Sequence, residues 1–264
     1  MSQIEWSFVI PAYNEEDSIE DALGALDEVV KSRKMIYEIV VVDDGSVDKT
    51  FLKAMMYASR NGHVRVVSYD KNVGKGYAVK AGFMQTTGDV VVFADSDMDV
   101  DLGTVSSYVD ALKHGDIVIA SKWHPDSVVS MPLTRRILSH GFNVLVRLLT
   151  GANLKDTQVG LKVIRKSAFT NIFPRLCVKR YAFDVELLTV AKLYGLKVVE
   201  MPVKLTIGSS FSPKEVWKMF VDLLGIAYRL RILRFYQKSF AYADDSKRLM
   251  NRTTCHGNIQ NSSV

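Results

Sequence analysis

Five short apolar runs, rich in β-branched residues, recur along the first half of the chain and constrain its fold most strongly. They cover residues 7–10, 39–42, 64–67, 90–93 and 117–120. Segments with apolar residues at helical spacing separate the runs. Strands that are apolar at every position are covered on both faces, as in a parallel sheet between layers of helices. The sequence therefore predicts an α/β fold with a mostly parallel, Rossmann-like sheet flanked by helices.

Polar segments follow three of these runs, at residues 11–15, 43–46 and 95–99. Because right-handed crossovers bring the carboxyl ends of parallel strands to one edge of a sheet, we expect these segments to lie together. Ligands of open α/β sheets bind at that edge. A glycine-bearing loop before a helix, at residues 71–76, adds a candidate phosphate cradle. Taken singly, each segment also fits an ordinary turn or loop.

Alternating carboxylates at Asp95, Asp97 and Asp99 make the third segment the most informative. Charged groups at the end of a buried strand cost desolvation energy unless something compensates them. Mg²⁺ or Mn²⁺ would do so, because these cations prefer hard oxygen ligands. An isolated D-x-D is more often a solvated acidic turn, so the metal hypothesis depends on the segments around it.

In this order, the segments resemble the glycosyltransferases of family 2, which have the GT-A fold. That family reads P-x-Y-N-E, V-V-V-D-D-G-S, N-x-G-K and D-x-D at similar intervals. Farther along, residues 155–162 and 181–187 are similar to the D-T-Q-x-G-x-K and F-D-x-E-L motifs of its polyprenyl-phosphate branch. That branch includes dolichyl-phosphate glucose and mannose synthases. The resemblance extends over residues 7–236.

The resemblance implies a metal-dependent enzyme that moves a hexose, glucose or mannose, from a UDP- or GDP-sugar to dolichyl or another polyprenyl phosphate, with inversion. One alternative is a family 2 enzyme that acts on a saccharide hydroxyl and depends more on a general base. Another is a non-catalytic protein that binds sugar nucleotides. The intact D-x-D and Asp156 favour an enzyme.

The resemblance also assigns roles to individual residues. Asp97 and Asp99 would bind Mg²⁺ or Mn²⁺, with Asp97 and Asp156 as the catalytic residues and Asp156 acting as base or orienting group. Binding of the nucleotide sugar falls to residues at the strand ends and in the glycine loop: Pro11, Tyr13, Glu15, Val42, Asp44, Lys75, Asp95 and Ser96.

An acceptor phosphate is largely ionised at neutral pH, since its second pKa is about 6, so cations matter more than a base. Candidate cations for the acceptor phosphate are Lys122, Arg135, Arg136 and Lys214. Lys122 stands where arginine is usual in this branch. Ser210 stands where several relatives carry a lysine, and Lys204 or Lys214 could substitute for it.

We expect one GT-A domain over residues 1–236, with a nucleotide-sugar half at 1–121 and an acceptor half at 122–236. Residues 237–264 are polar with almost no apolar periodicity and predict a disordered tail. The net charge of +5 comes without a dense run of Lys and Arg, so nucleic acid is not expected as a partner.

Two arginine-rich amphipathic stretches, residues 132–151 and 213–236, predict C-terminal helices. Their apolar stripes fit either core packing or an interfacial pair of helices lying on an anionic membrane. No uninterrupted apolar span and no signal peptide is recognisable. We therefore expect peripheral association with the cytoplasmic face of a membrane.

Overall fold

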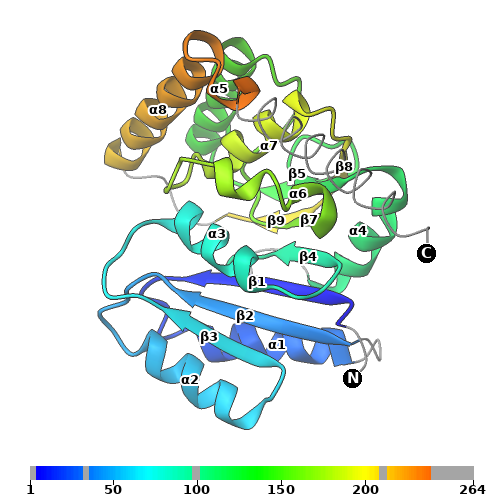
Figure 1. Cartoon of the computed structure of the whole chain (residues 1–264), viewed down its shortest axis with the longest axis vertical. Helices are drawn as coiled ribbons and strands as arrows, with labels where there is room; N and C mark the ends of the chain where they lie inside the picture. The colour runs from blue at the N-terminus through cyan, green and yellow to red at the C-terminus, as the bar shows by residue number, and fades with distance from the viewer. Residues whose placement is uncertain (1–3, 32–35, 97–101, 208–212, 239–264) are drawn as a thin grey trace, which may run out of the picture.

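A seven-stranded sheet runs through the centre of the molecule (Figure 1), in the order β3-β2-β1-β4-β7-β5-β8. The structure is a computed structural model that describes residues 4–31, 36–96, 102–207 and 213–238. Every strand pair is parallel except the two pairs that involve β7, which confirms the mostly parallel α/β fold. The strands are β1 (Trp6–Ala12), β2 (Tyr37–Asp43), β3 (Val64–Ser68), β4 (Val90–Phe93), β5 (Ile117–Ser121), β7 (Lys162–Arg165) and β8 (Val198–Pro202).

Helices cover both faces of the sheet because successive residues of each strand point to opposite sides. Ile39 and Val41 of β2 face one apolar cluster, whereas Val40 and Val42 face the other. The first cluster packs under α1 (Ile19–Lys31), α2 (Thr50–Arg60) and α4 (Val105–Ala111). The second packs under α3 (Lys75–Gln85), α5 (Leu133–Thr150), α7 (Phe183–Leu193) and α8 (Pro213–Ala227).

Shorter elements complete the described part of the chain. A second, two-stranded parallel sheet joins β6 (Val128–Ser130) and β9 (Lys204–Thr206). The remaining helical turns are α6 (Lys166–Phe169), η1 (Leu102–Thr104), η2 (Leu112–His114), η3 (Phe173–Arg175) and the π-helical turn η4 (Tyr228–Ile232).

Strand β7 is antiparallel and is inserted between β4 and β5, an arrangement that the sequence did not predict. Lys162 lies opposite Phe93 of β4 and Ile119 of β5. Its buried ammonium donates to the carbonyl of Val159 at 2.6 Å and pairs with Asp184 at 3.0 Å. Because β7 runs backwards, the loop that precedes it lies at the carboxyl ends of β4 and β5.

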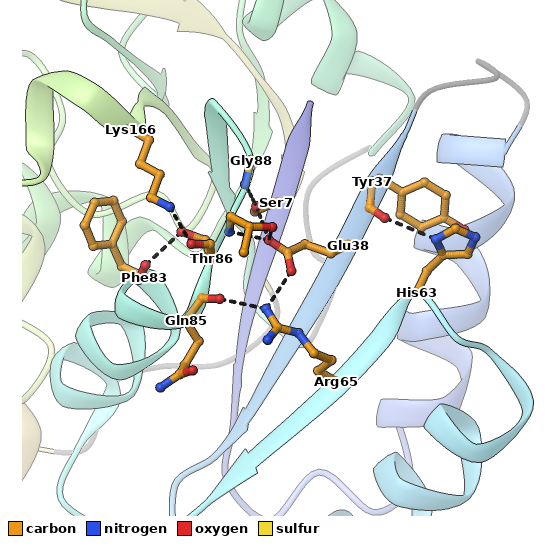
Figure 2. A network of polar contacts seen from close by, with 11 residues as sticks. Ser7, Tyr37, Glu38, His63, Arg65, Phe83, Gln85, Thr86, Gly88 and Lys166 are labelled. Carbon is orange, nitrogen blue, oxygen red and sulfur yellow. Dashed lines mark hydrogen bonds and ion pairs between the residues drawn. The ribbon is translucent and has the colours of Figure 1, made fainter. Parts of the chain in front are cut away.

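A buried carboxylate, that of Glu38, holds the amino ends of β1 to β4 together (Figure 2). These ends lie opposite the carboxyl ends of the strands, where the loop before β7 lies. Glu38 accepts hydrogen bonds from Ser7 Oγ at 2.6 Å and from Thr87, and it pairs with Arg65 at 2.6 Å. Burial disfavours the charged form, but the hydrogen bonds from Ser7 and Thr87 and the Arg65 contact hold the pKa of Glu38 below its usual value.

The second amphipathic helix is shorter than the predicted 213–236. It passes into the π-helical turn, after which Arg234 adopts a φ of 50°, in the left-handed region, and the chain turns back. This turn buries Tyr236, whose hydroxyl donates to the buried carboxylate of Glu186. None of the helices in the described ranges is long and apolar enough to cross a membrane.

Candidate active site

A cleft of about 410 Å³ opens at the carboxyl ends of β1, β2 and β4. Strand β1 has β2 on one side and β4 on the other, so the cleft lies where the strand order reverses, the usual ligand site of such sheets. Seven of the eight residues predicted to bind a nucleotide sugar line it: Pro11, Tyr13, Glu15, Asp44, Lys75, Asp95 and Ser96. The expectation that the three strand-end segments meet is confirmed.

Val42 is the exception, and its assignment to the nucleotide pocket needs correction. Its side chain is 0% exposed and packs in the cluster under α3, where it faces Gly82. Val42 precedes the end of β2 by one residue, and its side chain is directed into the helix layer rather than along the strand toward the cleft. It therefore supports the core behind the site.

Asp44 shapes the glycine loop. Its Oδ1 accepts hydrogen bonds from Tyr69 Oη at 2.7 Å and from the Val73 amide at 2.9 Å. Its Oδ2 accepts from Asn72 Nδ2 at 3.0 Å and from the Gly74 amide at 2.8 Å. A carboxylate has about four acceptor positions, so the loop takes up the hydrogen-bonding capacity of Asp44. Its contribution to the cleft is to hold this loop in place.

The loop is also held from the other side, because Gly74 and Gly76 sit directly against the segment that precedes α7. Gly74 has a φ of +119°, and a Cβ on it would lie 2.5 Å from the carbonyl oxygen of Lys179. A Cβ on Gly76 would lie 2.4 Å from Cβ of Phe183. Only glycine permits this approach, which brings Arg180 and Tyr181 to the cleft.

Asp95 is an ionised carboxylate in the cleft wall. Burial disfavours its anion, but the Lys75 ammonium, at 2.5 Å, outweighs this effect and holds the pKa of Asp95 below its usual value. An ionised carboxylate is the hard oxygen ligand that Mg²⁺ and Mn²⁺ prefer, so this part of the D-x-D fits a divalent cation. The predicted ligands Asp97 and Asp99 lie outside the described residues, and within those residues no three metal-ligating side chains cluster.

Gly160, in the loop before β7, gives the Asp95 carboxylate its room. A Cβ on Gly160 would lie 2.1 Å from Asp95 Oδ2. We expect Gly160→Ala to displace this carboxylate and to lower kcat/KM by about 100-fold, the cost of a displacement of about 1 Å in a catalytic group. Steady-state kinetics will measure the effect. The control is Gly24→Ala on α1, where the added Cβ meets no atom within 4 Å and activity should stay unchanged. Wild-type activity of Gly160→Ala would contradict a role of Asp95 in the reaction.

Asp156 and Lys122, predicted as catalytic residue and acceptor-phosphate ligand, are bound to each other. Asp156 is 0% exposed and accepts from the Lys122 amide at 2.9 Å, from Lys122 Nζ at 3.2 Å and from the Gln158 amide at 3.1 Å. Neither side chain belongs to the cleft lining. The cation of Lys122 is therefore neutralised by Asp156, and of the two roles expected of Asp156 the enclosed carboxylate fits the orienting group better than the base.

The segments around this pair carry polar atoms that lack partners. Ser121 Oγ, Trp123 Nε1 and Thr157 Oγ1 are buried without a hydrogen bond in the described part of the chain. Buried polar groups are nearly always hydrogen-bonded, so unpaired ones in a native fold need an explanation. A polar ligand beside Lys122 and Asp156 would supply it.

The other three acceptor candidates, Arg135, Arg136 and Lys214, lie in the first turns of α5 and α8 and do not line the cleft. Between the two helices runs a small, mainly apolar crevice of about 40 Å³. It is lined by Leu138, Ser139, Phe142, Gln158, Val216 and Met219. Through Gln158 the crevice reaches the loop that holds Asp156.

Comparison with known proteins identifies the family. The model of the family described as "Glycosyl transferase family 2" matches residues 7–173. The dolichyl-phosphate β-glucosyltransferase of Homo sapiens is 35% identical over 246 residues, which cover 86% of this chain and 75% of that protein. The chain belongs to glycosyltransferase family 2. The dolichyl-phosphate β-glucosyltransferase of Dictyostelium discoideum is 32% identical over 247 residues, covering 87% of this chain and 76% of that protein.

Solved structures support the GT-A fold of this glycosyltransferase. Glucosyl-3-phosphoglycerate synthase from Mycobacterium tuberculosis, crystallised with Mn²⁺, UDP-glucose and phosphoglyceric acid, gives a TM-score of 0.65 at 21% identity. The match covers 85% of this chain and 79% of that chain. At this identity the likeness shows a shared fold, and the expected GT-A architecture is confirmed.

The cleft of this family 2 enzyme is also lined by residues that were not among the eight expected nucleotide-sugar ligands. They are Ala12, Asn72, Gly74, Arg180, Tyr181, Glu215 and Lys218. Asn72 and Gly74 belong to the glycine loop, and Arg180 and Tyr181 precede the F-D-x-E-L motif, so their positions carried a signal. Glu215 and Lys218 come from α8, which the sequence analysis placed with the acceptor and the membrane.

Proposed function

We propose that this glycosyltransferase transfers glucose from UDP-glucose to dolichyl phosphate, with a divalent cation at the D-x-D motif. The curated relatives, which match most of this chain and most of their own length, carry this proposal, because they are named dolichyl-phosphate β-glucosyltransferases. The cleft at the switch point supports it, because the residues expected from the family motifs meet there.

In this proposal the donor lies along the cleft from Tyr13 to Asp95. Tyr13 is exposed at the end of β1 and offers an aromatic face on which a base can stack. Glu15 and Pro11 form the wall around it. Lys75 and the ionised Asp95 also line the cleft, and we assign the diphosphate and the glucose to this pair.

A Mg²⁺ or Mn²⁺ ion held by Asp95, Asp97 and Asp99 would act as Lewis acid for the departing diphosphate. Within the chain, Lys75 keeps Asp95 ionised and Gly160 leaves space for its carboxylate. Both residues thus prepare the oxygen ligand before any cation binds, which lowers the cost of organising the site.

The acceptor phosphate would enter from the side of α5 and α8. Its oxygen attacks the anomeric carbon and the bond to the diphosphate breaks, so an ionised phosphate needs positioning rather than deprotonation. We assign Arg135, Arg136 and Lys214, at the starts of the two helices, to this positioning. Asp156, enclosed by hydrogen bonds from Lys122 and Gln158, would orient Lys122, and the unpaired hydroxyl of the adjacent Thr157 is available to a polar ligand.

A membrane surface would present that acceptor. α5, α8 and the turn that follows α8 leave large apolar side chains exposed, which favours the interfacial over the core-packing interpretation for these residues. They are Leu133, Ile137, Leu138, Val144, Leu145, Leu148, Trp217, Val221, Leu224, Tyr228, Ile232, Leu233 and Phe235. Contiguous exposed apolar surface is typical of protein or membrane contact sites. Together with Arg136, Arg147 and Arg234, which are also exposed, it favours an anionic lipid surface.

We expect the variant Trp217→Ser with Ile232→Ser to lose at least tenfold of its affinity for anionic vesicles. These side chains are 65% and 70% exposed, and burying one large apolar side chain contributes about 1.5–3 kcal/mol. Co-sedimentation measures the binding, and the melting temperature should not change because neither side chain packs in the core.

A matched control is available on α2, at the opposite end of the molecule (Figure 1). Leu52 and Met56 are 55% and 50% exposed there, so Leu52→Ser with Met56→Ser removes similar apolar area elsewhere. Equal loss of vesicle binding in both double variants would contradict the membrane assignment to α5 and α8.

The proposed function is tested by a donor screen. The purified protein is given UDP-glucose, UDP-galactose, GDP-mannose or GDP-glucose with a short polyprenyl phosphate and Mn²⁺, and released nucleoside diphosphate is measured. We expect release with UDP-glucose that depends on the polyprenyl phosphate. Release from GDP-mannose alone would replace the proposed donor, and release that soluble saccharides stimulate instead would replace the proposed acceptor.

A further inference from the structure

Helix α8 has three distinct faces. Its buried face carries Met219, Leu223 and Ile226. The exposed apolar face, proposed above to contact lipid, carries Trp217, Val221 and Leu224. The third face carries three charged residues, Glu215, Lys218 and Asp222. In each set the residues are spaced by three or four positions, so each set forms one stripe along the helix.

The charged face is directed toward the donor cleft. Glu215 and Lys218 line the cleft together with Pro11 of β1 and with Lys75 and Asp95. One turn farther along, Asp222 pairs with Arg180 at 3.1 Å, and Arg180 also lines the cleft. A helix that is separated from the nucleotide motifs by more than a hundred residues therefore forms one wall of the site they build.

Among the described residues three cations line the cleft, and two of them are neutralised by ion pairs. Lys75 pairs with Asp95 at 2.5 Å, and Arg180 pairs with Asp222 at 3.1 Å. Lys218 is exposed and has no ion pair with any residue of the described ranges. An unpaired ammonium in a cleft can accept an anionic ligand without first breaking an internal ion pair.

We infer that Lys218 binds the diphosphate of the sugar nucleotide, so that α8 belongs to the donor site as well as to the acceptor side. The inference builds on the proposed function, since it requires a nucleoside diphosphate donor. Lys218 would donate hydrogen bonds to a diphosphate oxygen and stabilise the charge that develops as the bond to glucose breaks. Lys214, one turn earlier on α8, does not line the cleft and remains assigned to the acceptor phosphate.

Lys218→Gln tests this inference, with Lys179→Gln as the matched control. Lys179 is an exposed lysine next to Arg180 that does not line the cleft, so it loses the same charge without touching the site. Titration calorimetry measures the binding of UDP and of uridine, which lacks the phosphates. Steady-state kinetics measures KM for UDP-glucose and for the polyprenyl phosphate.

We expect Lys218→Gln to weaken UDP binding about tenfold or more, as the loss of a charge-assisted hydrogen bond does, and to leave uridine binding unchanged. Lys218→Arg, which keeps the charge, should retain most of the affinity, and Lys179→Gln should bind like the wild type. KM should rise for UDP-glucose and not for the polyprenyl phosphate.

Three outcomes would overturn the inference. Unchanged UDP binding in Lys218→Gln would exclude contact with the diphosphate. An equal loss for UDP and uridine would show an effect on the fold or the base end. A rise of KM for the polyprenyl phosphate alone would place Lys218 on the acceptor. If the wild-type protein binds neither UDP nor GDP, the proposed function itself is wrong.

Discussion

Replacement of Asp156 by alanine is expected to destabilise the fold and to abolish turnover. The substitution leaves the Lys122 ammonium, whose side chain is only 8% exposed, without its partner. Breaking a buried ion pair on one side costs about 3–5 kcal/mol of the free energy of unfolding, because an uncompensated charge stays inside. Chemical denaturation measures that loss, and a product assay measures the turnover.

A double variant separates the structural role of the pair from its role in the reaction. Lys122→Met with Asp156→Leu removes both charges, and such replacements are often neutral or stabilising. We expect this double variant to recover part of the lost stability, although the amides of Lys122 and Gln158 still lack an acceptor. Turnover should stay absent, because Lys122 and the carboxylate that orients it are both missing. If activity returned together with stability, the pair would only maintain the fold, and our assignment of Asp156 would be wrong.

Replacement of Asp97 by alanine is expected to lower kcat by about 100- to 1,000-fold, the range seen when one preorganised electrostatic contact to a transition state is removed. Asp97 is the middle of the three alternating aspartates at 95, 97 and 99, and it follows the ionised Asp95 of the cleft wall by two residues. Excess EDTA should inactivate the wild-type enzyme to a similar extent, and Mn²⁺ or Mg²⁺ should restore it.

The control for this substitution is Asp110→Asn, at an exposed carboxylate on α4 that does not line the cleft. It should behave like the wild type with and without chelator. Full activity of the wild type in excess EDTA would show that the reaction needs no divalent cation. Normal Mn²⁺ dependence in Asp97→Ala would assign the cation to other ligands.

The donor side was predictable because its signals are local. Pro11, Tyr13, Asp44 and Asp95 each lie at or just beyond the end of a strand, and the crossover rule places parallel strand ends at one edge. Val42 failed because a motif position does not reveal which way a strand residue points. Its side chain packs under α3, on the same face of the sheet as Val40.

The acceptor side was less predictable because distant residues decide it. Strand β7 is only four residues long, and Lys162 at its start is tolerated inside the sheet because Asp184, from α7, neutralises it. Nothing near Lys162 in the sequence signals that partner. Likewise, the pairing of Lys122 with Asp156 joins residues 34 positions apart.

Helix α8 shows the same limit in another form. Its spacing reveals three stripes, but it does not reveal that the charged stripe carrying Lys218 faces the nucleotide motifs. Its end was also misjudged, because the turn at Arg234 depends on the burial of Tyr236 against Glu186.

Product analysis tests most directly whether glucose passes from UDP-glucose to dolichyl phosphate. The purified protein is incubated with UDP-glucose radiolabelled in the sugar, dolichyl phosphate in anionic vesicles and Mn²⁺. Label in the organic phase is compared with released UDP. We predict equal amounts of UDP and of a glucose-labelled lipid phosphate from which mild acid frees glucose. Release of UDP with all label remaining in water-soluble products would contradict this transfer.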